Sequence, residues 1–335
     1  MSGAEVRPTG ADAVWFVAPG KAELRHETVA EPAPGELTVR SVCSMVSAGS
    51  EMHVYRGEAN LPTMPIFEGN LPFPVKFGYQ QVGVVELAGA ETGFEVGERV
   101  LCLYPHQSVF TLTSDRAVRI PDAVTDVGAA FSQLLGVAVN SLVTRPVMIG
   151  EYVAVSGLGA IGMFTAHLAR CEASRLILVE PNAGRRAAAA WIGADAVVDP
   201  RDARDTIADL TGGQGVDLFI ECSGAGPALQ LALDSTAVEG TITVTAWYGA
   251  REVSLSLSPE FHLRRHRVLS SGPSLPADLG PRWTHARIQS VAFEQIAKLD
   301  VDKLFNIRRI PFSDAPRGYA LLDGVDPPAA VLFAY

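Results

Sequence analysis

Three glycines at fixed spacing are the residues in this chain that point most directly to a chemistry. They lie in Gly157-Leu158-Gly159-Ala160-Ile161-Gly162, after an apolar run at 152–156 and before a helical pattern at 163–170. In a strand–turn–helix unit the first glycine permits the turn, the second lets backbone approach a pyrophosphate, and the third lets helix pack on strand. The helix N-terminus presents unpaired N–H groups to phosphates. The motif therefore predicts a dinucleotide site.

An acidic residue follows at the spacing that a nicotinamide dinucleotide needs. The next apolar run, 175–179, ends at Glu180, eighteen residues after Gly162. A carboxylate there accepts both ribose hydroxyls of NAD and repels the 2′-phosphate of NADP. Arg185 and Arg186 lie just beyond and could favour NADP. We expect NAD(H) as the cofactor, with NADP(H) as an open alternative. The other alternative is an ordinary βαβ unit in which the acidic residue falls at this spacing by chance.

Composition bounds the class of protein. The chain has 335 residues, 48% of them hydrophobic and 19% charged, which suits a globular enzyme with room for two domains. Its net charge of −10 argues against nucleic acid or an anionic membrane surface as a partner. The N-terminus has no signal-peptide pattern, and the four cysteines are scattered without a C-x-x-C. We expect a cytoplasmic protein that binds a small molecule.

Hydrophobic patterning supplies the elements that must position the motif. Residues 12–125 show short β-type runs between turn signals, which predicts a small, partly open barrel. A proline-rich segment at 61–74 is predicted to be a loop beside a ligand site. Residues 126–143 have helical spacing, and strands then alternate with helices, which predicts an α/β fold with a doubly wound parallel sheet.

The pattern breaks after about residue 272. A loop at 274–284, helices at 285–299 and from 311, and a final strand at 330–333 are predicted to return to the first domain. We therefore expect a catalytic domain of residues 1–145 and 273–335, and a dinucleotide-binding domain of residues 146–272.

The β-rich first part followed by the glycine motif resembles the medium-chain dehydrogenase/reductase family over essentially the whole chain. The resemblance implies a Rossmann domain, a GroES-like catalytic domain, an active site between them, and a homodimer or homotetramer. Most alcohol dehydrogenases of the family hold a catalytic zinc. Here Ala48 stands for the ligand cysteine, Tyr79 and Gln80 for the His-Glu pair, and Gln133 for a ligand glutamate. An alanine offers no ligand atom, and an amide or phenol is a poor one, so we expect no metal.

A closer resemblance is to the zinc-lacking subgroup that includes bacteriochlorophyllide a hydroxyethyl dehydrogenase. The segments that carry it are 55–58, 72–79, 105–107, 247–249 and 282–283.

The resemblance also implies roles for single residues. Tyr79 would be the acid that replaces zinc, Ser50 the relay hydroxyl and His53 the relay imidazole. A core tyrosine, a turn serine and a surface histidine are the alternatives. Glu51 would be structural, because the histidine that it orients in zinc enzymes is absent. The remaining candidates are Arg185, Cys222 and Ala246 for the cofactor, and Gln80, His106, Gln133, Trp247 and Trp283 for the substrate pocket.

The main functional hypothesis is a zinc-independent, NAD(H)-dependent alcohol dehydrogenase or ketoreductase. The second is a reductase of polarised C=C bonds, which the position of a deuteride delivered from labelled cofactor would distinguish. The third is a non-catalytic nucleotide-binding relative, which would bind NADH tightly without turnover on a wide carbonyl panel.

Overall fold

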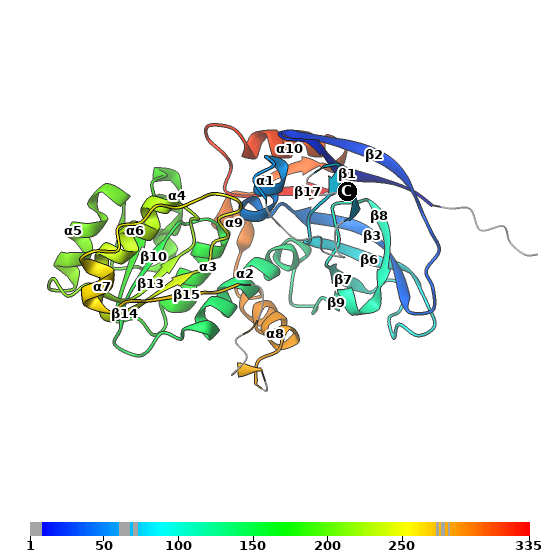
Figure 1. The fold of residues 1–335 in the computed structure, drawn as a ribbon. Helices are drawn as coiled ribbons and strands as arrows, with labels where there is room; N and C mark the ends of the chain where they lie inside the picture. Colours follow the sequence, from blue (N-terminus) through cyan, green and yellow to red (C-terminus); the bar gives the residue numbers. More distant parts are fainter. Residues whose placement is uncertain (1–8, 60–67, 70–72, 273–274, 276–278, 281) are drawn as a thin grey trace, which may run out of the picture. The chain divides into compact units, whose positions relative to one another are not determined.

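The computed structural model describes residues 9–59, 68–69, 73–272, 275, 279–280 and 282–335 (Figure 1). The chain divides into two compact units. The first unit is Met1–Phe131 with Leu299–Tyr335, and the second unit is Ser132–Lys298.

The second unit is built on a parallel six-stranded sheet with the order β12-β11-β10-β13-β14-β15. Neighbouring strands pair in parallel throughout, for example Tyr152 with Arg175 and Thr241 with Arg267. The predicted doubly wound sheet is confirmed, and its strand order reverses between β10 and β13, where such folds bind ligands. The strands are β10 Tyr152–Ser156, β11 Arg175–Val179, β12 Ala196–Val198, β13 Val216–Glu221, β14 Thr236–Val244 and β15 Arg267–Ser270.

Helices α3 to α7 of this unit lie around the sheet (Figure 1), and local capping explains where two of them begin. Asn182 Oδ1 accepts the N–H of Arg185 at 3.0 Å at the start of α4. Asp199 Oδ1 accepts the N–H of Arg201 at 3.1 Å, and Pro200 then opens α5. The helices are α3 Ala160–Ala169, α4 Ala183–Ala188, α5 Pro200–Leu210, α6 Gly226–Ser235, α7 Glu260–Arg264 and α8 His285–Ile296.

The described residues of the first unit form two sheets. Strand β3 lies inside the larger, seven-stranded sheet and pairs with β6, β8 and β17. The smaller sheet has the order β2-β1-β5-β4. The strands are β1 Thr9–Ala18, β2 Lys21–Val29, β3 Glu36–Met45, β4 Glu68–Gly69, β5 Val75–Lys76, β6 Gln81–Ala88, β7 Arg99–Cys102, β8 Val109–Thr113, β9 Ala117–Arg119, β16 Arg308–Pro311 and β17 Val331–Ala334.

Helices α1 and α10 pack together in this unit, although they come from opposite ends of the chain (Figure 1). The rings of Tyr55 on α1 and Tyr319 on α10 stack at 5.6 Å. Phe16 of β1 meets the Tyr319 ring edge-on at 4.8 Å, so the C-terminal segment closes the core around α1. The helices are α1 Ala48–Tyr55, α9 Val301–Phe305 and α10 Ala315–Leu322.

Helix α2, Asp126–Thr144, runs across the division between the units. Gln289 of α8 donates to Ser132 Oγ at 2.9 Å, and Asn140 donates to the carbonyl of Gly272 at 2.7 Å. These bonds tie most of α2, together with α8, to the second unit. The boundaries between the units therefore lie after residues 131 and 298. The boundaries expected from the sequence lie after residues 145 and 272. By length and composition alone this helix could cross a membrane. Most of it is buried inside the protein, however, as is usual for a core helix.

Some elements differ from those the sequence predicts. Strand β15 and helix α1 were not predicted, because both are short and lack strong periodicity. The helix predicted at 285–299 ends at Ile296. In the proline-rich segment, residues 61–67 and 70–72 lie outside the described residues, and Glu68–Gly69 form strand β4 by pairing with β5.

Candidate functional site

The glycine turn between β10 and α3 has the geometry that a pyrophosphate needs. Gly157 has φ +83°, and a Cβ there would lie 2.6 Å from Ser223 Cα. A Cβ on Gly162 would lie 1.8 Å from the carbonyl oxygen of Gly157, whereas one on Gly159 would meet nothing within 4 Å. The first and third glycines therefore serve the fold, and the second borders open space.

Helix α3 begins directly after this open space. Its N-cap is Gly159, which makes no side-chain cap, and its first turn is Ala160, Ile161 and Gly162. The N–H groups of such a first turn have no partner inside the helix and are available to phosphate oxygens. These residues fit the dinucleotide that the motif predicts.

Glu180 follows β11 and is fastened to the turn. Its Oε2 accepts the N–H of Leu158 at 2.7 Å, and its Oε1 accepts the N–H of Asn182 at 2.9 Å. The carboxylate is buried, yet each oxygen keeps a lone pair for a ribose hydroxyl. Arg186 donates to the carbonyl of Glu180 at 2.6 Å and pairs with Asp199 at 3.3 Å, so its charge is partly neutralised away from this carboxylate.

A second carboxylate, which sequence reasoning missed, follows β13. Glu221 is fully buried, and its Oε1 accepts the N–H groups of Ser223 at 2.6 Å and Gly224 at 3.1 Å. Its Oε2 accepts the phenol of Tyr248 at 2.8 Å, and burial together with this carboxylate raises the pKa of Tyr248. Glu221 shapes the loop against which Gly157 packs. The sequence signal that could have identified Glu221 is an acidic residue at the carboxyl end of a strand, as at Glu180.

Two of the other cofactor candidates, Cys222 and Ala246, follow the carboxyl ends of β13 and β14. The N–H of Cys222 bonds to the carbonyl of Ser156 at 2.9 Å, and that of Ala246 to the carbonyl of Glu221 at 3.2 Å. Burial raises the pKa of the Cys222 thiol to about 12, so it is a neutral packing group. Arg185 lies on α4 and is half-buried.

Two tryptophans predicted for the substrate pocket also belong to the second unit. Trp247 is half-buried and follows Ala246. Trp283 lies under Arg287, whose guanidinium carbon is 4.3 Å from its ring centroid. A pocket of about 360 Å³ lies beside Tyr248 and is lined by Gly224, Gly226, Pro227, Gln230, Tyr248, Arg251, Glu252, Val253 and Ser254. Neither tryptophan lines it.

In the first unit, Tyr79 is held by two hydroxyl groups of the segment that opens α1. Its phenol donates to Ser47 Oγ at 2.5 Å and lies 3.3 Å from Ser50 Oγ. Burial raises the pKa of Tyr79 above its ordinary value of 10.0, the two serine bonds oppose this, and the Glu51 charge adds to it. The structure thus brings Tyr79 and Ser50 together. It adds Ser47, which sequence reasoning missed although it lies one residue before Ala48.

His53 lies farther along α1. Its imidazole is buried, and Nδ1 lies 3.4 Å from Glu58 Oε2. The structure thus pairs this relay candidate with a carboxylate just beyond the end of α1.

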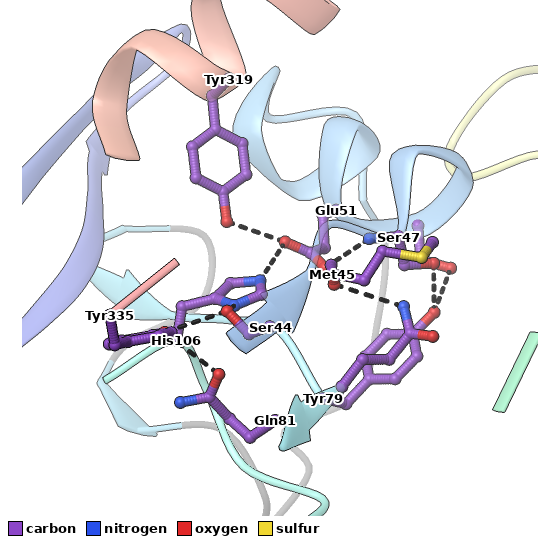
Figure 2. A network of polar contacts seen from close by, with 11 residues as sticks. Ser44, Met45, Ser47, Glu51, Tyr79, Gln81, His106, Tyr319 and Tyr335 are labelled. Carbon is purple, nitrogen blue, oxygen red and sulfur yellow. Dashed lines mark hydrogen bonds and ion pairs between the residues drawn. The ribbon is translucent and has the colours of Figure 1, made fainter. Parts of the chain in front are cut away.

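A network of buried polar groups extends from Tyr79 through the interior of the first unit (Figure 2). Glu51 Oε1 accepts the N–H of Ser47 at 2.7 Å, and Oε2 accepts the phenol of Tyr319 at 2.8 Å. His106 Nε2 lies 3.0 Å from the same Oε2, and its Nδ1 lies 2.7 Å from Ser44 Oγ. The predicted pocket residue His106 is therefore placed in the interior of the unit.

The positions of the family's zinc ligands carry poor donors. Gln80 is fully buried and donates to the carbonyl of Met45 at 3.4 Å, and Gln133 lies on α2 in the second unit. Burial raises the pKa of the Cys43 thiol to about 12, so this thiol is not a ready thiolate ligand. Within the part of the chain that the structure describes, no group of three or more His, Cys, Asp or Glu could hold a metal. This donor set does not fit zinc.

Known proteins resemble this chain in sequence. The family profile described as "Zinc-binding dehydrogenase" matches residues 157–279. D-guloside 3-dehydrogenase of Escherichia coli (strain K12) is 30% identical over 264 residues, which cover 74% of this chain and 75% of that protein.

Solved structures share the fold over nearly the whole chain. A Sinorhizobium meliloti 1021 protein described as a zinc-binding dehydrogenase, bound to NADP, has a TM-score of 0.78 at 22% identity, with 98% of this chain and 100% of that chain covered. A short chain alcohol dehydrogenase from E. coli CFT073, complexed with NADH, has a TM-score of 0.76 at 18% identity, with 97% and 99% covered.

Proposed function

The chain belongs to the medium-chain zinc-type alcohol dehydrogenase family, and we propose that it interconverts a secondary alcohol and a ketone without zinc, with Tyr79 as the acid/base. As a member of this family it is an NAD(P)-dependent oxidoreductase that acts on CH–OH groups. The observation that carries the finer proposal is that the Tyr79 phenol is held by Ser47 at 2.5 Å and Ser50 at 3.3 Å. The family resemblance aligns Tyr79 with a ligand of the zinc enzymes.

The chain's own residues would handle the proton. In reduction, bound NAD(P)H supplies the hydride to the carbonyl carbon. Tyr79 gives its phenolic proton to the oxygen as negative charge develops there. The Ser47 and Ser50 hydroxyls then donate to the phenolate oxygen and stabilise it. In oxidation the phenolate accepts the alcohol proton. The N–H groups of Ala160 and Ile161, the open space at Gly159 and the Glu180 carboxylate would bind the cofactor.

Metal content tests the zinc-free part of the proposal. Protein that has been purified and dialysed is expected to contain almost no zinc by elemental analysis, and a chelator is expected to leave turnover unchanged. A variant with Ala48→Cys, Tyr79→His and Gln133→Glu restores the donors that zinc prefers and serves as a positive control for uptake. One zinc per chain in the native protein would overturn this part.

We also propose that NAD(H) is preferred over NADP(H), because the Glu180 carboxylate at the ribose position repels a 2′-phosphate. The expected ratio of kcat/KM, NADH over NADPH, is about tenfold or more, which corresponds to about 1.4 kcal/mol of discrimination. Glu180→Gln removes the charge and is expected to narrow the ratio. A preference for NADPH in the native protein would contradict this assignment and implicate Arg185.

The first unit would be the catalytic domain and the second the dinucleotide domain, in a homodimer or homotetramer located in the cytoplasm and related to the zinc-lacking subgroup. Light scattering on the purified protein measures the mass, and a monomer would contradict the assembly.

A further inference from the structure

Glu51 is a fully buried carboxylate whose partners come from three separate elements. The N–H of Ser47 comes from the turn before α1, His106 from the loop after β7, and the Tyr319 phenol from α10. A buried charge is costly unless hydrogen bonds satisfy it. Glu51 is therefore held in one position by groups that lie 4, 55 and 268 residues away along the chain.

Glu51 and Tyr79 both form a hydrogen bond with Ser47. Ser47 gives its backbone N–H to Glu51 Oε1 at 2.7 Å and receives the Tyr79 phenol on its own Oγ at 2.5 Å (Figure 2). Because the backbone N and the Oγ of Ser47 are linked only through Cα and Cβ, fixing the N–H restricts where the hydroxyl can lie.

The outer partners are themselves anchored. His106 Nδ1 lies 2.7 Å from Ser44 Oγ, which in turn lies 2.9 Å from Tyr335 Oη. The Tyr319 ring packs edge-on against Phe16 at 4.8 Å. Neither donor to Glu51 can turn away without disturbing the core of the unit.

Given the role of Tyr79 proposed above, we infer that Glu51, His106 and Tyr319 are positioning residues for proton transfer. They hold the Ser47 hydroxyl on the Tyr79 phenol. Their hydrogen bonds also compensate the negative charge of Glu51, which would otherwise oppose the ionisation of Tyr79 more strongly.

The ionisable groups around this site fix the direction of the effect. Glu51 is the negative group that faces Tyr79, and burial and Glu51 together hold the pKa of Tyr319 well above its ordinary range. Burial also raises the pKa values of Tyr335 and Cys43, so both stay neutral. His106 is the basic group that faces Glu51. Removing a donor leaves the Glu51 charge less compensated by hydrogen bonds, so this charge opposes the Tyr79 phenolate more strongly.

The test is a double-mutant cycle between Tyr319→Phe and Tyr79→Phe. Tyr319→Phe alone is expected to lower kcat about threefold to tenfold, to leave KM for the cofactor unchanged, and to move the alkaline limb of the oxidation profile to higher pH. In a Tyr79→Phe background the same change is expected to have no further effect on kcat. His106→Gln removes the basic partner of Glu51 and is expected to act in the same direction.

Tyr55→Phe is the matched control. Tyr55 stacks on Tyr319 in the same core, but its phenol donates to the carbonyl of Gly20 at 2.6 Å. It is expected to change thermal stability while leaving kcat and the pH profile as in the native protein.

The outcomes separate two failures. If Tyr79→Phe keeps full turnover, the proposed function itself fails. If Tyr79→Phe loses turnover but Tyr319→Phe has no effect, acts equally in both backgrounds, or behaves as Tyr55→Phe does, only the positioning role is overturned.

Discussion

Tyr79→Phe is expected to lower turnover at least about tenfold while leaving NADH affinity unchanged, because a positioned acid/base commonly contributes a hundredfold or more. The substitution removes one oxygen and keeps the ring in place. That oxygen is the group that Ser47 and Ser50 hold, and the nucleotide turn belongs to the other unit. Binding and chemistry should therefore separate in steady-state kinetics and NADH titration.

The role of Tyr79 also predicts how the rates of oxidation and reduction change with pH. Oxidation needs the phenolate, and burial raises the pKa of Tyr79 above 10.0, so the rate of oxidation should climb with pH into the alkaline range. Ionising a phenol of pKa about 10 at pH 7 costs about 4 kcal/mol. Reduction needs the neutral phenol and should be flat around neutral pH.

The Phe variant should lose the alkaline limb of oxidation. Tyr104→Phe is a suitable control, because Tyr104 stacks on Phe110 at 4.2 Å in a different core cluster of the same unit. Unchanged turnover in Tyr79→Phe would remove Tyr79 from the chemistry.

The parts of the molecule that the sequence predicts are those set by neighbours along the chain. The glycine turn, the acid after β11 and the alternation of buried runs with helices all depend on spacings of a few residues. They predict the parallel sheet of the second unit. Strand β15 was missed because only four residues, Arg267–Ser270, form it, and its pairing with β14 is decided by the sheet rather than by its own pattern.

The parts that the sequence does not predict depend on contacts between distant residues. Tyr79 and Ser50 could be named as candidates, because a family motif marks both positions. Tyr319 could not, since it lies 268 residues from Glu51 and sits in a helix whose pattern shows only that one face is buried. Glu221 had a local signal, an acid at the end of a strand, but its partner Tyr248 comes from the next loop along the sheet.

The second large effect is expected in the glycine turn, where two alanine substitutions should fail in different ways. In Gly162→Ala the new methyl would lie 1.8 Å from the carbonyl oxygen of Gly157. Alanine gains about 1 kcal/mol of helix propensity over glycine, but overpacking against backbone costs about 3 kcal/mol or more. We expect the midpoint of thermal unfolding to fall by several degrees, with cofactor binding lost as a consequence.

In Gly159→Ala the added methyl fits the folded protein but would clash with a bound cofactor. The backbone at Gly159 is extended, with φ −74°, and a Cβ meets nothing within 4 Å, so thermal unfolding should change little. The same methyl would occupy the space through which a pyrophosphate approaches the turn, so the Kd for NADH should rise about tenfold or more, or about 1.4 kcal/mol. Calorimetric titration with NADH and a thermal melt on both variants separate the two effects. Native NADH affinity in Gly159→Ala would mean that the pyrophosphate does not lie against this glycine, and the open space there would need another explanation.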